Sequence, residues 1–546
     1  MSAKDGRHRT IDSVDFEILW NGLIMIVDEG AFAIVRTSMS KVVVEGRDFG
    51  AMLYDPRGNL LAADVSIASK TGATSIVVRE LLKHFPPGTL RPGDAIATNN
   101  PWWIMGHLND IAIVAPIFYR GRLVAFAECV AHMADIGGSL SGAPREVYEE
   151  GIIIPPLRVS TADGEDSTFF SMLEANVRVP GQVAGDVRAL IAGTRVMEAG
   201  VHAFLEKHKL PDLELLGGMV LERSERTMRN AIRSAIPEGV YEGSTGIDGF
   251  DEPLSIKARV IAKGGQLEVD FEGSSPQSSL GINSTLVYTN VWCKYIVKCL
   301  VAPDLPNNEG TFAPISVKAP AGSFLNPRFP APVKMKPSSG HYIPIAIVDA
   351  LAEVIPERIL AESGNKFLVY LAGRDENDRA FSDLMFVMGG MGARANKDGL
   401  HCMSFPANSS NLPIEVLETA IPVRVQHKRL RPDSGGAGRF RGGCGQDLAL
   451  ESLSSHPLTA RAEHGKLHTA PLGLRGGKPG APGGLFVNDQ EIADKLPVVL
   501  EQGDVLRLLT PGSGGAYAPH QRDPQALEAD IQNEIVTPQA AEREYK

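Results

Sequence analysis

Cysteine is scarce in this sequence, and its distribution excludes two kinds of site. The 546 residues include five cysteines, at positions 129, 293, 299, 402 and 444, and no two of them form a CxxC pair. The odd number argues against a disulfide framework, and the missing CxxC pair argues against a zinc site built from thiolates. A reducing compartment suits free thiols, so we expect a cytoplasmic protein.

An excess of positive charge and long apolar runs are also missing. The chain has 54 Lys and Arg against 65 Asp and Glu, a net charge of −11. Nucleic-acid binders carry a basic surface, so we expect no nucleic-acid partner. The first ten residues, MSAKDGRHRT, are polar, unlike a signal peptide. The densest apolar segments, 23–27 and 111–118, are shorter than a bilayer span, so we expect no membrane association.

The residues that are present indicate an α+β chain of several units. Apolar residues follow helical spacing over 14–40, where Ser13 is the expected N-cap, and again over 183–208 and 213–235. The Asp55-Pro-Arg-Gly58 turn between two apolar runs predicts a hairpin. Alternation on both sides of Gly264-Gly265 predicts another.

These patterns divide the chain into an N-terminal α+β metal-site region, central helices and a β-rich C-terminal part. In detail we predict five units: an N-terminal α+β unit with a metal-binding hairpin at 1–182, a helical segment at 183–240, a mixed α+β unit at 241–432, a Gly-rich β unit at 433–525, and a polar C-terminal tail at 526–546 that could dock on a partner.

Two HxxD units carry the chemistry of the chain. They are His107-Leu-Asn-Asp110 and His132-Met-Ala-Asp135. Between them, the strand-like runs IAIVAPIFY and LVAFAECV are joined by Arg120-Gly-Arg122, the pattern of a β-hairpin. A turn centred on Gly121 places Asp110 opposite His132. It also places His107 opposite Asp135, so the open end of the hairpin would gather two imidazoles and two carboxylates about 5 Å apart.

Two interpretations of this cluster stay open from the residues alone. Imidazole and carboxylate ligands suit Zn²⁺, Mn²⁺ or Fe²⁺, and three protein ligands would leave a position for water or substrate. Alternatively, the histidines cap the strand ends and pair with the aspartates. Asp48 follows the first predicted helix. Taken by itself, it is interpreted as a surface residue that pairs with the neighbouring Arg47.

The order of motifs along the chain resembles the hydantoinase B/oxoprolinase family. The resemblance covers nearly the whole chain through a series of segments: DFGAMLYDPRGNLLA (48–62), TNNPWW (98–103), GHLNDIAIVAPIF (106–118), AHMADIGG (131–138), YEEGIIIPP (148–156), NVRVPGQVAGDVRA (176–189), VDFEGSSPQSSLGIN (269–283), PNNEGTFAPISVKAPAGSFLNP (306–327), DSGGAGRFRGGCG (433–445) and TPGSGGAYAPHQRDP (510–524).

The resemblance implies an activity and a partner. Family members are subunits of ATP-dependent enzymes that hydrolyse cyclic amides such as hydantoins, lactams and 5-oxoproline, or that carboxylate ketones such as acetone and acetophenone. A separate hydantoinase A-type subunit, with an actin-like ATPase fold, binds ATP and Mg²⁺ and phosphorylates the carbonyl oxygen of the substrate. This chain has no GxxxxGK[ST] loop, which agrees with ATP being bound by the partner in a hetero-oligomer.

The resemblance also implies site residues. The family's metal ligands fall on His107, Asp110 and His132, with Asp48 as a further ligand. Asp135 would orient one of the ligands, and either Asp110 or Asp135, whichever is not a ligand, would act as the general base. One departure concerns Asn100, which stands where the family often has Asp and so removes a carboxylate near the site.

Three functions follow in order of preference. The first is hydrolysis of a cyclic amide whose carbonyl oxygen the partner has phosphorylated. The second is ATP-dependent ketone carboxylation, which requires the same ion and the same partner. The third is a non-catalytic scaffold for the ATPase partner, in which the HxxD units are purely structural.

Overall fold

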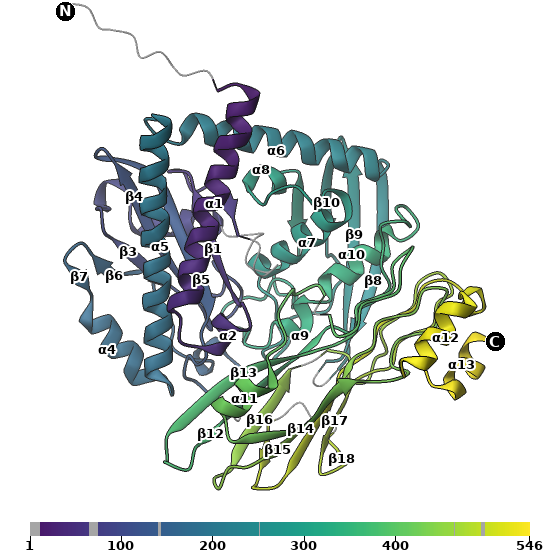
Figure 1. Cartoon of the computed structure of the whole chain (residues 1–546). Helices are drawn as coiled ribbons and strands as arrows, with labels where there is room; N and C mark the ends of the chain where they lie inside the picture. Colours follow the sequence, from purple (N-terminus) through teal and green to yellow (C-terminus); the bar gives the residue numbers. More distant parts are fainter. Residues whose placement is uncertain are drawn as a thin grey trace, which may run out of the picture.

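The computed structural model describes residues 11–64, 75–139, 144–249, 252–403, 405–463, 465–492 and 497–546. It is an α+β protein, as the sequence predicts. Within the described residues the strands form four sheets, and long helices cover the first two of them (Figure 1). The boundaries of the five predicted units stay a prediction.

The strands of the first sheet differ in length, and each neighbouring pair of strands is antiparallel. Its order is β2-β1-β5-β4-β3-β6-β7. The strands are β1 (Phe49–Tyr54), β2 (Leu60–Ala63), β3 (Ala95–Thr98), β4 (Asp110–Tyr119), β5 (Arg122–His132), β6 (Leu157–Thr161) and β7 (Gly164–Glu165). Both hairpins that the sequence predicts here, β1–β2 and β4–β5, are confirmed.

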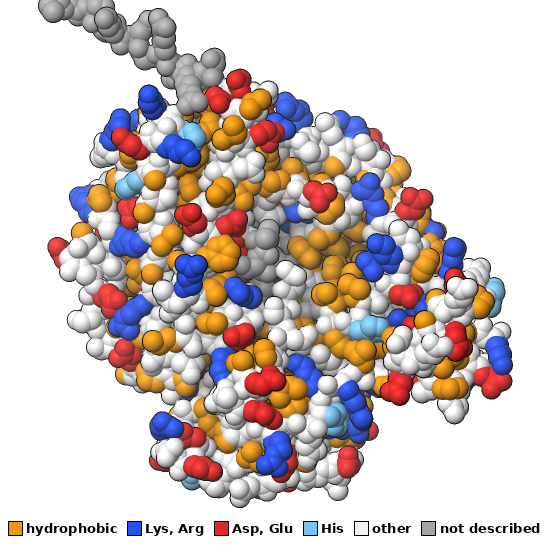
Figure 2. All heavy atoms as spheres, viewed as in Figure 1, with side chains coloured by type: hydrophobic (Ala, Val, Ile, Leu, Met, Phe, Trp, Pro, Cys, Tyr) orange, Lys and Arg blue, Asp and Glu red, His pale blue; other side chains and the backbone are white. Residues whose placement is uncertain are grey.

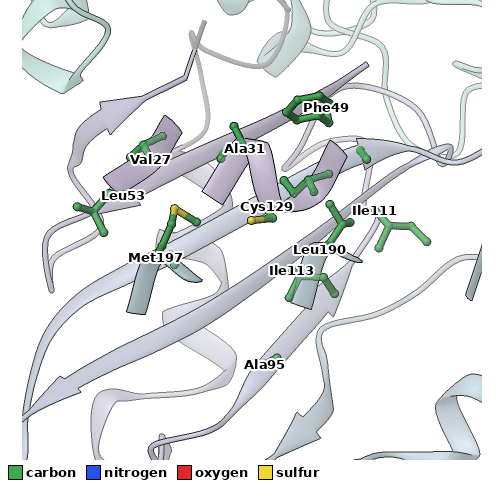
Figure 3. Close-up of a cluster of buried hydrophobic side chains, with 14 of the residues drawn as sticks. Val27, Ala31, Phe49, Leu53, Ala95, Ile111, Ile113, Cys129, Leu190 and Met197 are labelled. Carbon is green, nitrogen blue, oxygen red and sulfur yellow. The ribbon is translucent and has the colours of Figure 1, made fainter. Parts of the chain in front are cut away.

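Helices bury both faces of this sheet. Two long helices, α1 (Ser13–Thr37) and α5 (Pro180–His208), lie side by side on one face (Figure 1). Alternate strand residues such as Phe49 and Leu53 point into that core, which Figure 3 shows together with side chains of both helices. The intervening residues, such as Met52 and Tyr54, pack against α3 (Ser75–His84) on the other face. Burial on both faces explains why β4 and β5 are almost continuously apolar.

The start of α1 differs in one detail from the prediction. Asp12, and not Ser13, is the N-cap: its Oδ1 accepts hydrogen bonds from the N–H groups of Val14 and Asp15, at 2.9 and 2.8 Å. Ser13 is the first helical residue. The negative charge of a carboxylate at the N-cap also interacts favourably with the positive end of the helix dipole.

Helix α1 lies within one or a few residues of the helix that the sequence predicts over 14–40, but it is more apolar along its length than the short segment 23–27 indicated. It is the one helix in the described part of the chain that meets the length and composition of a membrane span. Leu23 and Val27 are nevertheless fully buried against the first sheet and α5. The core helix of a soluble protein meets the same criteria.

Glycines set the close packing of α1 on α5, and this yields a stability prediction. A Cβ on Gly193 would lie 2.9 Å from both Cys129 Sγ and Ile34 Cγ1. We expect Gly193→Ala to lower the free energy of unfolding by about 2 kcal/mol through overpacking. Gly181→Ala in the same helix is the matched control, because nothing lies within 4 Å of its added methyl group. That variant should gain stability from helix propensity. Urea unfolding of both variants tests this, and a shift of the same sign in both would contradict it.

The central part of the chain builds a second core. Helix α6 (Glu214–Ala235) leads into the sheet β11-β10-β9-β8, and α7 (Leu286–Val301) and α10 (Ile343–Leu351) pack on it. Helix α6 occurs where the helical spacing over 213–235 predicts one. The strands are β8 (Gly239–Ile247), β9 (Leu254–Lys263), β10 (Gln266–Asp270) and β11 (Ile315–Lys318). The predicted β9–β10 hairpin is confirmed.

Two further sheets form the β-rich C-terminal part. Their orders are β13-β12-β16-β19 and β14-β15-β20-β17-β18, and a third core lies between them. The strands are β12 (Lys366–Arg374), β13 (Ala380–Met388), β14 (Val423–Leu430), β15 (Gln446–Ser452), β16 (Leu458–Glu463), β17 (Gly484–Val487), β18 (Gln490–Glu491), β19 (Val498–Leu500) and β20 (Val505–Leu509). The shorter helices are α2 (Lys41–Val44), α4 (Ser167–Asn176), α8 (Glu309–Phe312), α9 (Pro337–Gly340) and α11 (Ile414–Ala420).

The last residues are helical and dock on the chain itself. Helices α12 (Pro524–Gln532) and α13 (Pro538–Tyr545), yellow in Figure 1, pack against the Gly-rich segment near Ala437. Asp530 anchors them: its Oδ2 lies 3.0 Å from Arg441 Nε and 2.5 Å from Arg522 Nη2. The segment predicted as a tail is therefore a folded cap, because a buried charge network holds it.

Candidate metal centre

The open end of the β4–β5 hairpin brings Asp110 and His132 together. The two residues are directly opposite in the antiparallel ladder, in the register that a turn centred on Gly121 predicts. A bulge between Ile117 and Phe118 shifts the pairing only near the turn. The ladder begins at Asp110 and ends at His132, so His107 and Asp135 lie beyond it.

His107, Asp110 and His132 form a compact and buried group. One ligand atom from each residue lies within 4.8 Å of the others. His107 Nε2 is 2.8 Å from Asp110 Oδ2, and His132 Nδ1 is 3.8 Å from Asp110 Oδ1. Their side chains are only 1–4% exposed. Two imidazoles and one carboxylate at this spacing fit a divalent ion with a position left open, and no thiolate joins them.

The turn before β4 aims His107 at this group. Gly106 adopts a φ of +87°, and a Cβ there would lie 3.0 Å from Tyr288. Asn99 holds the turn from the other side, because its Nδ2 donates to Leu108 O at 2.9 Å while its Oδ1 accepts from Ile154 N at 2.7 Å. The backbone O of Lys334 lies 3.3 Å from His107 Nδ1, which fixes the orientation of the ring.

The two other predicted site residues lie beside the group. The backbone O of Asp48 accepts the N–H of His132 at 3.0 Å, and the Asp48 residue is half-buried at the end of β1. It does not belong to the compact group of three. Asp135 is also outside the group of three, and its carboxylate accepts Arg178 N at 2.5 Å and Arg178 Nη1 at 2.7 Å.

Lys336, which no sequence pattern predicts, contacts the proposed metal ligand Asp110. Lys336 Nζ is 3.1 Å from Asp110 Oδ2, and it stands 4.2 Å from the centre of the Tyr288 ring. The Lys336 side chain is 4% exposed. It offsets the charge of the buried Asp110. No local pattern marks it, because 226 residues separate the two side chains along the chain.

A small cavity lies near the group, since Asn109 precedes Asp110 in the chain and the backbone of Lys334 contacts His107. It measures about 20 Å³, room for roughly one water molecule, and Asn109, Asp135, Lys334 and Arg461 line it. Arg461 Nη2 is 2.6 Å from Glu463 Oε1, and the pKa of Glu463 is raised to about 7 by burial. Burial likewise lowers the pKa of Lys334 to about 8. The charged side chains at this cavity thus come from three parts of the chain: the end of the hairpin, the 334–336 segment and β16.

Burial raises the pKa of Glu150 to about 8, and this predicts a pH dependence of stability. Its Oε1 accepts the N–H groups of Val333 and Lys334 at 2.6 and 2.7 Å. The folded state keeps a proton that the unfolded chain releases above about pH 4.5, so stability falls as the pH rises from there to about 8. One such proton contributes up to about 1 kcal/mol per pH unit.

We therefore expect Glu150→Gln to flatten this slope. Urea unfolding at about pH 5 and about pH 8 measures it. Glu174→Gln, at an exposed position of α4, is the control and should keep the wild-type slope. Equal slopes in wild type and Glu150→Gln would contradict the prediction.

Asn100 has a backbone role in this structure. Its Oδ1 accepts the N–H of Trp102 at 3.0 Å, which closes an Asx turn just before the helical turn at 101–105. An aspartate could accept the same hydrogen bond. The missing carboxylate therefore leaves the local backbone intact.

Comparisons with known proteins agree over almost the whole chain. The sequence profile of the Hydantoinase B/oxoprolinase family matches residues 12–519. The B-type subunit of a putative D-/L-hydantoinase from Pseudomonas sp. (strain NS671) is 30% identical, over 98% of this chain and 95% of that protein. The crystal structure of ATP-dependent caprolactamase from Pseudomonas jessenii superposes with a TM-score of 0.91 at 25% identity, covering 98% of this chain and 96% of the other.

A nucleotide-free structure of acetone carboxylase is also similar, with a TM-score of 0.89 over 98% of this chain and 80% of the other. At 19% identity this likeness concerns the fold alone. The match of the family profile and the 30% identity to the hydantoinase relative cover the hairpin, the histidines and the C-terminal sheets alike. The chain belongs to the hydantoinase B/oxoprolinase family.

Proposed function

We propose that this chain is the metal-containing subunit of an ATP-dependent enzyme that hydrolyses a cyclic amide of the hydantoin, lactam or 5-oxoproline type. A hydantoinase A-type partner would bind ATP and Mg²⁺ and phosphorylate the carbonyl oxygen first. The observation that carries the proposal is the buried group of His107, Asp110 and His132 at the hairpin end. The similarity to a putative hydantoinase and to caprolactamase over nearly the whole chain supports it.

The donor set fits Zn²⁺, Mn²⁺ or Fe²⁺, and His107, Asp110 and His132 would hold the ion. Asp48 is the further ligand of this proposal, since its backbone already contacts His132. When bound, such an ion supplies Lewis acidity to an oxygen of the substrate or of water.

Phosphorylation by the partner would make a poor electrophile reactive. An amide carbon resists attack because of resonance with its nitrogen, and phosphorylation of the oxygen removes that resonance and creates a leaving group. Water then adds to the carbon, and the ring C–N bond breaks as the nitrogen takes up a proton, which leaves an acyl phosphate. A second water molecule hydrolyses the acyl phosphate to the free carboxylate and phosphate. Asp135 is the proposed general base, because it lines the cavity beside the group and Arg178 fixes its orientation.

The positive side chains beside the cavity suit the negative charge that the phosphoryl group brings. Lys334 and Arg461 line the cavity, and Lys336 lies at Asp110. A buried cation exerts a stronger field on an anion than a solvated one. A cytoplasmic setting belongs to the same proposal, because the five cysteines are free in the structure.

One experiment tests the proposal. The chain is purified with an A-type partner and assayed with 5-oxoproline, hydantoin and ε-caprolactam, with ring opening and phosphate release as readouts. Turnover should require both subunits, ATP and a divalent ion, and it should not depend on bicarbonate. Bicarbonate-dependent turnover of acetone or acetophenone, without ring opening, would instead identify a carboxylase. Undiminished turnover after removal of the ion would exclude a catalytic role of the metal and would favour the scaffold function for this chain.

A further inference from the structure

A second cavity lies away from the hairpin end, between the central and C-terminal parts of the chain. It measures about 90 Å³. One wall is α10, with Ile345 and Val348, and the facing wall includes Phe405 and Leu474. Figure 2 shows hydrophobic side chains gathered on this face of the molecule where α10 lies in Figure 1. At roughly 15 Å³ for one water position, the cavity suits a molecule of about six or seven non-hydrogen atoms.

One nitrogen of a buried imidazole at this cavity lacks a hydrogen-bond partner among the described residues. His341 lines the cavity, is 4% exposed, and its Nδ1 has no partner among the described residues. Its ring packs edge-on against Trp292, with centroids 5.0 Å apart. Burial holds the pKa of His341 well below its usual value, so the ring is neutral. An unpaired polar atom at such a depth costs stability, and a ligand could supply the missing bond.

The charged groups at the cavity are already paired. Glu362 Oε1 is 2.7 Å from Lys466 Nζ, and Glu362 Oε2 accepts the N–H of Leu472 at 2.7 Å. Asp349, at the exposed mouth, accepts the N–H of Ser244 at 2.9 Å. An added negative charge would therefore enter a largely apolar space that two carboxylates already line, which is unfavourable. The cavity suits an uncharged molecule.

The cavity is distinct from the candidate metal centre. Lys336, which contacts Asp110, stands over the ring of Tyr288. Tyr288 packs on Trp292, and Trp292 packs on His341. Tyr288 and Trp292 are fully buried and separate the two places.

We propose that this cavity is a second small-molecule site. It takes an uncharged molecule of about six or seven non-hydrogen atoms, with an apolar body and a hydroxyl or secondary amide that hydrogen-bonds to His341 Nδ1. Both groups donate and accept, so either can pair with this nitrogen in either neutral tautomer. The inference depends on neither the metal nor the partner.

Calorimetric titration of the purified full chain tests it, with δ-valerolactam as the amide probe and cyclohexanol as the alcohol probe. We expect saturable binding of at least one probe, and the probe that binds shows which group the site prefers. Cyclohexanecarboxylate should bind at least about tenfold more weakly, because it brings an unpaired charge. Binding should be unchanged in His107→Ala.

Two variants address the cavity itself. Val348→Trp blocks the mouth and should weaken binding at least tenfold, whereas Val240→Trp, at an exposed position of β8 outside the cavity, should leave it unchanged. His341→Phe keeps a ring against Trp292 but removes the nitrogen, so binding should weaken about three- to tenfold. Far-ultraviolet circular dichroism confirms that each variant is folded. Three outcomes overturn the inference: no saturable binding of either probe, binding that Val348→Trp leaves intact, or binding that His107→Ala abolishes.

Discussion

His107→Ala and His132→Ala are each expected to remove the bound divalent ion and to lower turnover of the two-subunit enzyme by at least about a thousandfold. Each change deletes one of the four proposed ligands, and one of the three that form the compact group. Loss of groups that merely support a ligand already costs about 10- to 100-fold in affinity, so loss of a ligand should cost more. Elemental analysis of the purified chain gives the metal content, and the ATP-dependent ring-opening assay gives the turnover.

The fold should survive these changes, since the rest of the sheet does not depend on the two imidazoles. His520→Ala is the matched control, because that histidine is exposed in the 519–521 turn, outside the group of three. It should keep both metal and turnover. Full turnover in both His107→Ala and His132→Ala would exclude the metal centre from catalysis and leave the scaffold function.

Asp530→Ala is expected to release the C-terminal helices and to cost about 3 kcal/mol of stability. Its carboxylate pairs with two arginines whose side chains are nearly buried, Arg441 at 5% and Arg522 at 2% exposure. Removing one partner leaves buried charge behind, which costs more than the pair itself contributes. Asp398 still pairs with Arg522 at 2.9 Å, so the loss should fall at the lower end of the usual range.

Limited proteolysis and thermal unfolding measure this effect. The 524–545 segment should be cleaved faster in Asp530→Ala than in wild type. Glu528→Ala is the control on the same helix, because that side chain is exposed. Equal cleavage rates in wild type and Asp530→Ala would show that α12 and α13 are held by their apolar contacts alone.

The hairpin at the candidate site could be read from the sequence because its determinants are local. Two apolar runs of matching length flank Arg120-Gly121, and both residues adopt the positive φ that a tight hairpin turn requires. The turn fixes the register, and the register places Asp110 opposite His132. Helices α1, α5 and α6 were predictable for the same reason, since each follows a helical period over many residues.

The surroundings of the site could not be read in this way. Lys336, Glu150 and Arg461 reach it from segments far apart in the chain, and none of them stands in a recognisable pattern. Asp135 illustrates the limit most directly: the register placed it near His107, yet the structure pairs it with Arg178. The ladder ends at His132, so the direction of the chain beyond it depends on contacts with Arg178 and with the 149–152 segment.

The sequence by itself determined the α+β class, the family resemblance, and the meeting of a carboxylate and an imidazole at one hairpin end. Each follows from short-range periodicity, turn residues or ordered motifs. Only the tertiary structure decided that the group is buried, that lysine and arginine side chains surround it, and that the last helices cap the chain. Those features arise where segments hundreds of residues apart pack together, and the free energy of that packing depends on shape and charge that no local pattern records.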